Sequence, residues 1–141
     1  MGIETLYKEV MDLNMMADNA DKEAAAKAFF EKLNAMELPE YFNWADEIFE
    51  GLHVKERGDH TALIWTDIAT QEKQSFTYKE FAAKGNQCLN ALRGAGVEKG
   101  DNMYMLVPIA PETWFASYAC VKGGLVIVPT ATASTAAAST L

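Results

Sequence analysis

The segment from residue 76 to residue 130 constrains the fold more than any other part of the chain. It contains, in order, a helix start, a Gly-Val-x-x-Gly-Asp connector, an apolar run, a proline-started helix, a Gly-Gly turn and a second apolar run. Strand, helix and strand in this order predict a βαβ unit, whose right-handed crossover makes the two strands parallel. We predict strands at residues 102–107 and 125–128, and between them a helix with Pro111 in its first turn.

Burial of this unit can be predicted from its composition. Both strands are continuous apolar runs, which indicates that both faces of their sheet are covered. The helix between them carries Trp114, Phe115 and Tyr118 and is apolar nearly all round, so we expect it to be buried. The last residues, 131–141, are nearly all Ala, Thr and Ser without periodicity, and we predict a loose end there.

A well-specified helix start lies just before this unit. Thr77 is a good N-cap, Glu80 stands at the third helical position, and Phe76 and Phe81 are spaced for a hydrophobic staple. Gly85 falls inside the predicted helix, where glycine costs roughly 1 kcal/mol relative to alanine. We therefore expect Gly85 to permit close packing of the helix on the sheet.

Upstream of that helix, residues 61–66 and 74–76 predict a β-hairpin, because two strand-like runs are joined by a short polar loop. Before the hairpin, Asn43 is a good N-cap for a helix that the following glycines close. His53 and His60 follow without a second ligand-type residue at metal spacing. We predict that both are ordinary surface or loop histidines.

The front of the chain predicts a helical hairpin. Residues 3–17 and 21–36 each place apolar side chains at helical spacing, and Asp18-Asn19 interrupts the pattern. The sequence does not decide whether such a hairpin packs on its own domain or on a partner chain. We divide the chain into a helical hairpin, a partial α/β domain and a tail, at residues 1–40, 41–130 and 131–141.

Charge and cysteine content exclude several functions. The net charge of −8 lies entirely in residues 1–60, with 14 acidic and 6 basic side chains, since residues 61–141 carry 6 of each. No Lys/Arg cluster could neutralise phosphates, so we predict no nucleic-acid binding. No apolar stretch reaches ~18 residues, so we predict no membrane span. Cys88 and Cys120 lie among apolar neighbours, which favours buried free thiols and a cytoplasmic location.

Motifs that carry chemistry are missing from the sequence. It has no phosphate-binding G-x-x-x-x-G-K-[ST] loop and no G-x-S-x-G nucleophile elbow. Its glycines at 94, 96 and 100 lie one residue off a dinucleotide fingerprint and follow a helix, so they indicate a turn. The carboxylates are spread over polar faces. We therefore predict no catalytic, cofactor-binding or metal-binding residue in these 141 residues.

Residues 41–130 resemble the opening of the AMP-forming acyl-CoA synthetases, which are acyl-adenylate-forming ligases, and the acetyl- and medium-chain types most of all. The order and spacing of several short motifs carry this resemblance. They are Phe42-Asn43-Trp44-Ala45, Thr61-Ala62-Leu63-Ile64, Phe76-Thr77-Tyr78-Lys79-Glu80-Phe81, Asn86, Ala91-Leu92, Gly96-Val97, Lys99-Gly100-Asp101, Met105 to Pro108, Pro111-Glu112 and Val126 to Pro129.

The resemblance implies an α/β fold, namely the first part of the family's large N-terminal domain. It also implies a parent enzyme that uses ATP, Mg and CoA. A small carboxylic acid would attack ATP to give an acyl-adenylate and pyrophosphate, and the thiol of CoA would then displace AMP. The family's phosphate loop, adenine and ribose motifs and catalytic lysine match nothing in this sequence. No site residue can be carried over, and we expect the chain to be inactive by itself.

A second function class remains open. A small non-catalytic interaction or oligomerisation protein could reuse the start of this fold, and the acidic hairpin at residues 1–36 favours that interpretation.

The strand at residues 125–128 is apolar and uncharged, and it could form an unprotected edge. We expect the free chain to self-associate there, by strand pairing or by burial of Trp114 and Phe115.

Overall fold

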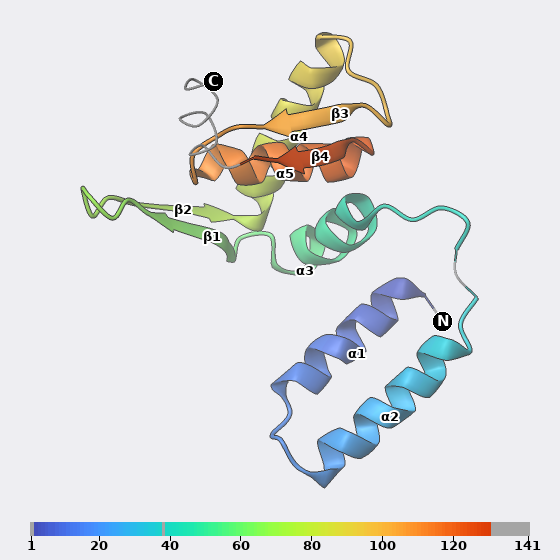
Figure 1. Cartoon of the computed structure of the whole chain (residues 1–141). Coiled ribbons are helices and arrows are strands. Elements are labelled where there is room, and N and C mark those ends of the chain that lie inside the picture. Colours follow the sequence, from blue (N-terminus) through green and yellow to red (C-terminus); the bar gives the residue numbers. More distant parts are fainter. Residues whose placement is uncertain (1, 38, 131–141) are drawn as a thin grey trace, which may run out of the picture. The chain divides into compact units, whose positions relative to one another are not determined.

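The computed structural model describes residues 2–37 and 39–130, and the predicted tail at 131–141 lies outside the described residues. The chain divides into two compact units, Met1–Phe42 and Asn43–Leu141 (Figure 1). The first is helical, and the second combines helices with two small sheets.

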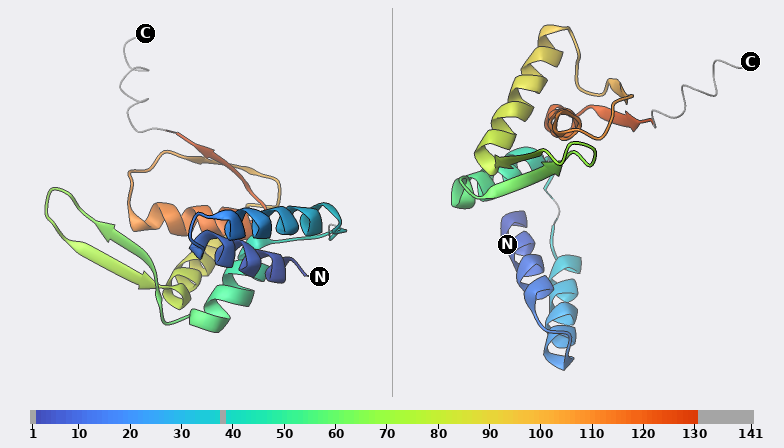
Figure 2. Two further views of the ribbon diagram at one scale, coloured as in Figure 1. Left: turned by 90° about the horizontal axis from the view of Figure 1, so that it is seen from below. Right: turned by 90° about the vertical axis from the view of Figure 1, so that its left-hand side faces the viewer.

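The first unit is a helical hairpin. Helix α1 (Ile3–Met15) and helix α2 (Ala20–Asn34) lie side by side and antiparallel, as both views of Figure 2 show. The side-chain oxygen of Asn19 caps α2 by accepting hydrogen bonds from the backbone N–H groups of Asp21 and Lys22, at 3.0 and 3.1 Å. These features confirm the predicted hairpin and its break.

The second unit begins with a helix that is π-helical at first and α-helical at its end. A π-helical stretch, η1 (Ala45–Val54), continues directly into a short α-helical turn, α3 (Lys55–Arg57). The Asn43 side chain accepts a hydrogen bond from the Ala45 N–H at 3.0 Å, as expected for the predicted cap. The helix runs through Gly51, because its buried face outweighs the weak helix propensity of one glycine, and it ends at Arg57, directly before Gly58. Of the predicted closing positions, Gly58 is therefore confirmed and Gly51 is not.

The prediction for His53 was wrong. His53 is only 5% exposed and lies on the buried face of η1, whereas His60 is exposed as predicted. The buried residues of η1 follow the spacing i, i+3, i+4, i+7 and i+8 of an amphipathic helix. Extending this spacing past Gly51 places His53 on the buried face. The buried residues are Ala45, Ile48, Phe49, Leu52 and His53.

A β-hairpin and a long helix follow. Strands β1 (Thr61–Thr66) and β2 (Lys73–Thr77) pair antiparallel, with Ile64 opposite Ser75 and a bulge between Thr61 and Leu63. This confirms the predicted hairpin, although β2 is longer than predicted. Helix α4 (Tyr78–Gly94) starts directly from β2.

The start of α4 is a complete capping box, as predicted. The Thr77 hydroxyl accepts a hydrogen bond from the Glu80 N–H at 3.2 Å, and the Thr77 N–H donates to the Glu80 carboxylate at 2.8 Å. The rings of Phe76 and Phe81 both meet the ring of Phe115 edge-on, at centroid distances of 5.1 and 5.3 Å. The two phenylalanines thus join the hairpin and α4 to a common aromatic partner.

The predicted parallel strands are present. Strand β3 (Asn102–Met105), helix α5 (Pro111–Gly123) and strand β4 (Val126–Pro129) follow one another, and β3 pairs parallel with β4, with Met103 opposite Ile127. Strand β3 is two residues shorter than predicted. Gly124 ends α5 with φ 69°, a left-handed conformation that glycine adopts without strain. The right-handed sense of the crossover stays a prediction.

Burial of this unit is less complete than the sequence suggests. Met105 is buried, but its neighbour Tyr104 points to the other face of the sheet and is 75% exposed. Helix α5 packs against β4. Among the described residues, therefore, one face of the sheet is covered and the other is open. Trp114 is half exposed, while Phe115 and Tyr118 are buried, so α5 is buried on one side only.

The core of the second unit lies where η1, α4 and α5 meet. Phe49 stands at its centre, with ring-centroid distances of 5.0 Å to Tyr118, 5.2 Å to Phe81 and 5.4 Å to Tyr78. Gly85 of α4 approaches the ring of Tyr118 on α5 so closely that a side-chain carbon would overlap it. The predicted close packing is present, but the partner is a helix rather than the sheet.

Candidate functional site

Polar side chains converge on Glu50, beside the aromatic core. One carboxylate oxygen of Glu50 accepts three hydrogen bonds: from the Tyr118 hydroxyl at 2.7 Å, from the Lys122 ammonium at 2.6 Å and from the Asn86 amide at 2.9 Å. These donors come from α4 and α5, whereas Glu50 lies on η1. We call these residues, together with Asp46, the Glu50 cluster.

Lys122 links η1 to the end of α5 through two carboxylates. Its ammonium lies 2.6 Å from Glu50 and 3.2 Å from the Asp46 carboxylate. The side-chain amide of Asn43 also donates to the Lys122 carbonyl at 2.9 Å. Both the backbone carbonyl and the side chain of Lys122 therefore attach the end of α5 to the start of η1.

The electrostatics of the cluster favour its charged form. Burial alone would raise the pKa of Glu50, but hydrogen bonds from Lys122, Tyr118 and Asn86 bring it below the ordinary value. Burial would lower the pKa of Lys122, but hydrogen bonds to Glu50 and Asp46 raise it. Burial and the neighbouring Glu50 carboxylate raise the pKa of Tyr118. At neutral pH the glutamate is ionised and the lysine and tyrosine keep their protons.

This arrangement stabilises the packing of three helices and is poorly suited to proton transfer. A general acid or base works best with a pKa near the working pH, and the three titratable groups named above are shifted away from neutrality. Removing Lys122 would leave the partly buried carboxylate of Glu50 without its cation, which is destabilising. We therefore assign the cluster a role in holding η1 against α4 and α5.

A second polar group surrounds His53. Arg57 has only donors, so its guanidinium donates to the Nδ1 atom of His53, at 2.9 Å, and Nδ1 is the unprotonated nitrogen. The same guanidinium stacks over the ring of Tyr78 at 5.1 Å. Burial first, and the charge of Arg57 second, lower the pKa of His53. The buried histidine is thus held in its neutral form.

Neither thiol is activated. Cys120 is fully buried and Cys88 is half-buried, so the prediction of two buried free thiols holds for Cys120 and only in part for Cys88. Burial raises the pKa of both thiols. A raised pKa lowers the thiolate fraction, which is the reactive form.

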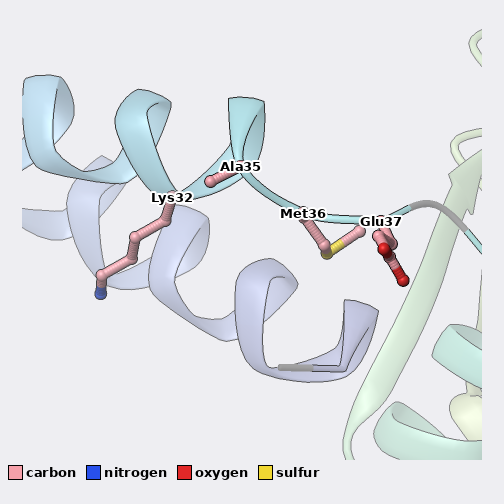
Figure 3. A pocket seen from close by; sticks show the side chains of 4 residues that line it. All are labelled: Lys32, Ala35, Met36 and Glu37. Carbon is pink, nitrogen blue, oxygen red and sulfur yellow. The ribbon is translucent and has the colours of Figure 1, made fainter.

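Among the hollows on the described surface, three are relevant here. One, of about 560 Å³, lies at the end of α2, where the Lys32 side chain runs away from Met36 and Glu37 (Figure 3). A second, of about 300 Å³, lies between α1 and α2. The third, of about 460 Å³, lies beside the end of β1, where the Trp65 indole donates to the Ile109 carbonyl at 3.1 Å.

The sequence predicted no site residue, and it missed the Glu50 cluster. The prediction that carboxylates are spread over polar faces fails at Glu50 and Asp46, which share one partly buried lysine. Asp46 and Glu50, four positions apart beside the apolar stripe of η1, were the available signal. Within residues 2–37 and 39–130, no group of three His, Cys, Asp or Glu side chains could hold a metal ion. Those residues also contain no helix long and apolar enough to cross a bilayer.

The fold and these contacts define the class of protein: an α/β unit in which η1, α4 and α5 meet in an aromatic core and a β-hairpin and a parallel strand pair complete the unit. Comparison with known proteins gives the family. The AMP-binding enzyme family matches residues 52–140. The chain is 46% identical over 96 residues to 4-hydroxybutyrate–CoA ligase 1 of Metallosphaera sedula, covering 68% of this chain and 17% of the relative. It is 39% identical over 74 residues to acetyl-coenzyme A synthetase of Xanthobacter autotrophicus, covering 52% of this chain and 11% of the relative.

Solved structures agree with this result. The N-terminal subdomain of NpsA from Klebsiella oxytoca aligns with a TM-score of 0.54 at 26% identity, over 61% of this chain and 21% of that one. The anthranilate CoA ligase AuaEII in complex with anthranoyl-AMP aligns with a TM-score of 0.54 at 29% identity, over 65% of this chain and 17% of that one.

The chain therefore belongs to the AMP-binding enzyme family, and it resembles the N-terminal part of the acyl-CoA synthetases. It spans 17% of the length of the Metallosphaera ligase and 11% of the Xanthobacter synthetase.

Proposed function

We propose that this chain is part of an acid–CoA ligase that converts a small carboxylic acid, ATP and CoA into an acyl-CoA, AMP and pyrophosphate. The observation that carries the proposal is the 46% identity to a 4-hydroxybutyrate–CoA ligase. The acetyl-coenzyme A synthetase relative also acts, by its name, on a small acid. We further propose a cytoplasmic location.

The role that we propose for these residues is structural. The Glu50 cluster and the aromatic core fix η1, α4 and α5 against one another. ATP, Mg and CoA would be bound by other parts of the enzyme. No step of the reaction is assigned to the residues described here, and the 141-residue chain is expected to be inactive by itself.

ATP binding tests this role directly. Isothermal titration of the purified 141-residue chain with ATP and magnesium should show no binding, and no acyl-AMP should form when acetate or 4-hydroxybutyrate is added. Stoichiometric ATP binding at micromolar affinity would disprove the structural role. The ligase proposal is tested separately, by measuring pyrophosphate release with any protein encoded by the complete reading frame.

A second candidate function is a non-catalytic interaction protein. The hairpin of α1 and α2 favours it, because it precedes the residues that the family matches. The genomic reading frame after Leu141 distinguishes the two functions. A continuing ligase sequence supports the enzyme, and a native stop codon supports the interaction protein.

Self-association of the free chain through an open strand edge is a separate expectation. Strand β4 pairs with β3 alone among the strands of the described residues, so its other edge is open there. Val126 is half exposed, whereas Phe115 is buried and cannot contribute as first expected. We expect sedimentation at micromolar concentration to show a dimer or larger species, and Val126→Lys to restore the monomer by charging the edge. A monomeric unchanged protein would show that the edge does not pair.

A further inference from the structure

His53 lies at the junction between the end of η1 and the start of α4. It is the next-to-last residue of η1, and α3 follows directly. Its ring lies 5.4 Å from the ring of Tyr78, the first residue of α4, and 6.5 Å from the ring of Phe49. The histidine is only 5% exposed. A change in the charge of this imidazole therefore acts directly on the packing of η1 and α3 against α4.

The imidazole accepts a hydrogen bond from a permanent cation. The Arg57 guanidinium donates to the Nδ1 atom of His53 at 2.9 Å, and a guanidinium keeps its charge in proteins. Nδ1 can accept this bond only while it carries no proton. Protonation of His53 would remove the acceptor and bring two positive charges together where water screens them poorly. A guanidinium that moved away from the imidazolium would leave the ring of Tyr78, whose centroid lies 5.1 Å from it.

The other groups that face His53 do not cancel this repulsion. Phe49 of η1 and Tyr78 of α4 present uncharged rings to it. Glu56 of α3 is an acidic group that raises the pKa of His53, but burial and the charge of Arg57 have larger effects and lower it. The balance leaves the pKa of His53 below its ordinary value of 6.5.

Few strong links hold the same junction outside the aromatic contacts. The N–H group of Tyr78 donates to the carbonyl of His60 at 3.0 Å. The N–H group of Lys79 donates to the carbonyl of Gly58, also at 3.0 Å. The Lys79 ammonium pairs with Asp59 at 2.9 Å, but both side chains are exposed, and such pairs contribute little to stability. The junction therefore depends on the buried ring contacts described above.

We propose that His53 is an acid-sensitive switch in the fold: protonation of its imidazole releases residues 55–60 from the start of α4, while the far end of α4 stays folded. This is a conformational property of the chain and does not depend on the ligase reaction.

The direction of the pH dependence follows from the pKa of His53 in the two forms. In the closed junction the pKa is lowered, whereas in the released form it returns to its ordinary value of 6.5. The released form therefore binds more protons. The closed junction keeps its full stability above pH 6.5 and loses stability as the pH falls from there towards the lowered pKa.

Hydrogen exchange of single amides, measured by NMR on the full 141-residue chain, tests the switch. The amides of His60, Tyr78 and Lys79 report on the junction, and those of Ala95 and Val97 report on the far end of α4. From about pH 7.5 to about pH 5.5, after correction for intrinsic exchange rates, protection at the junction should fall about threefold to tenfold. At the far end it should fall less than about twofold. A smaller loss at the junction, or an equal loss at both ends, overturns the proposal.

A pair of variants assigns the effect to one histidine. His53→Gln keeps an oxygen that can accept from Arg57 and stays uncharged, so protection at the junction should no longer depend on pH in this range. The control is His60→Gln, because His60 is the chain's other histidine and is exposed. The control should show the full loss. If His53→Gln keeps the loss, or His60→Gln abolishes it, His53 is not the switch.

A second pair tests the contact with Arg57 and does not require His53→Gln to fold. Arg57→Gln keeps a donor for Nδ1 but removes the charge, so the pKa of His53 should rise towards its ordinary value and the loss of protection in acid should become smaller. Lys55→Gln removes a charge from an exposed residue of α3 and should leave the loss unchanged. Equal effects of Arg57→Gln and Lys55→Gln would show that general charge governs the junction and would refute the switch.

Discussion

Gly85 offers the sharpest test of how the second unit is held together. Replacing it with alanine adds one carbon to α4, facing the ring of Tyr118 on α5. That carbon would overlap the Cδ1 atom of Tyr118 and lie 3.0 and 3.1 Å from its Cε1 and Cγ atoms. The ring cannot move aside freely, because Tyr118 is 4% exposed and packs on Phe49 and Phe81 at 5.0 and 5.7 Å.

The expected magnitude is the balance of three effects. Alanine is the better helix former by about 1 kcal/mol. Overpacking in a core costs about 1–3 kcal/mol. If the displaced ring also withdraws its hydroxyl from Glu50, now 2.7 Å away, a hydrogen bond to a charged group is lost, worth about 1.5–3 kcal/mol. Because the overlap with Cδ1 is severe, the overpacking cost lies near the upper end of its range, so we expect Gly85→Ala to lower the free energy of unfolding by about 2 kcal/mol if the hydrogen bond survives and by about 3.5–5 kcal/mol if it is lost.

Urea unfolding measures this change. With a denaturant slope of about 1–3 kcal/mol per molar, the midpoint should fall by about 1 M or more. The control is Gly94→Ala at the end of the same helix, where an added carbon meets nothing within 4 Å. That variant should be neutral or slightly more stable. An unchanged or raised midpoint for Gly85→Ala would refute the close approach of α4 and α5.

A double variant separates the two costs of Gly85→Ala. Tyr118→Phe keeps the ring and removes the hydroxyl group that donates a hydrogen bond to Glu50. If Gly85→Ala has already withdrawn that hydroxyl, adding Tyr118→Phe will cost little more. If the losses of unfolding free energy caused by the two substitutions add fully, the hydrogen bond survives in Gly85→Ala and the clash alone destabilises the core.

Two further predictions concern caps and charge. Thr77→Ala should lower the free energy of unfolding by about 1 kcal/mol, whereas Thr77→Ser keeps the hydroxyl cap and should not. Equal urea midpoints for these two variants would contradict the capping box. Glu50 should stabilise the fold above its ordinary pKa of 4.5, because the native pKa is lower, and this stabilisation is lost as the pH falls through the native pKa. The stability gap between the native protein and Glu50→Gln, measured by urea unfolding, should therefore narrow from pH 7 to pH 3; a constant gap would contradict this.

The sequence by itself determined the features that depend on neighbouring residues. The Thr77 capping box, the Asn43 cap and the proline at the start of α5 each depend on residues within a few positions, so local rules predict them. The parallel pairing of β3 and β4 was equally predictable, because a short helix between two strands leaves few other connections.

Only the tertiary structure decided which distant residues meet. Glu50 binds Asn86, Tyr118 and Lys122, which lie 36, 68 and 72 positions away along the chain. No local pattern encodes such partners, because they depend on how η1, α4 and α5 pack. The same packing gave Gly85 a helix as its neighbour and buried His53, since contacts across the core outweigh the preferences of single residues.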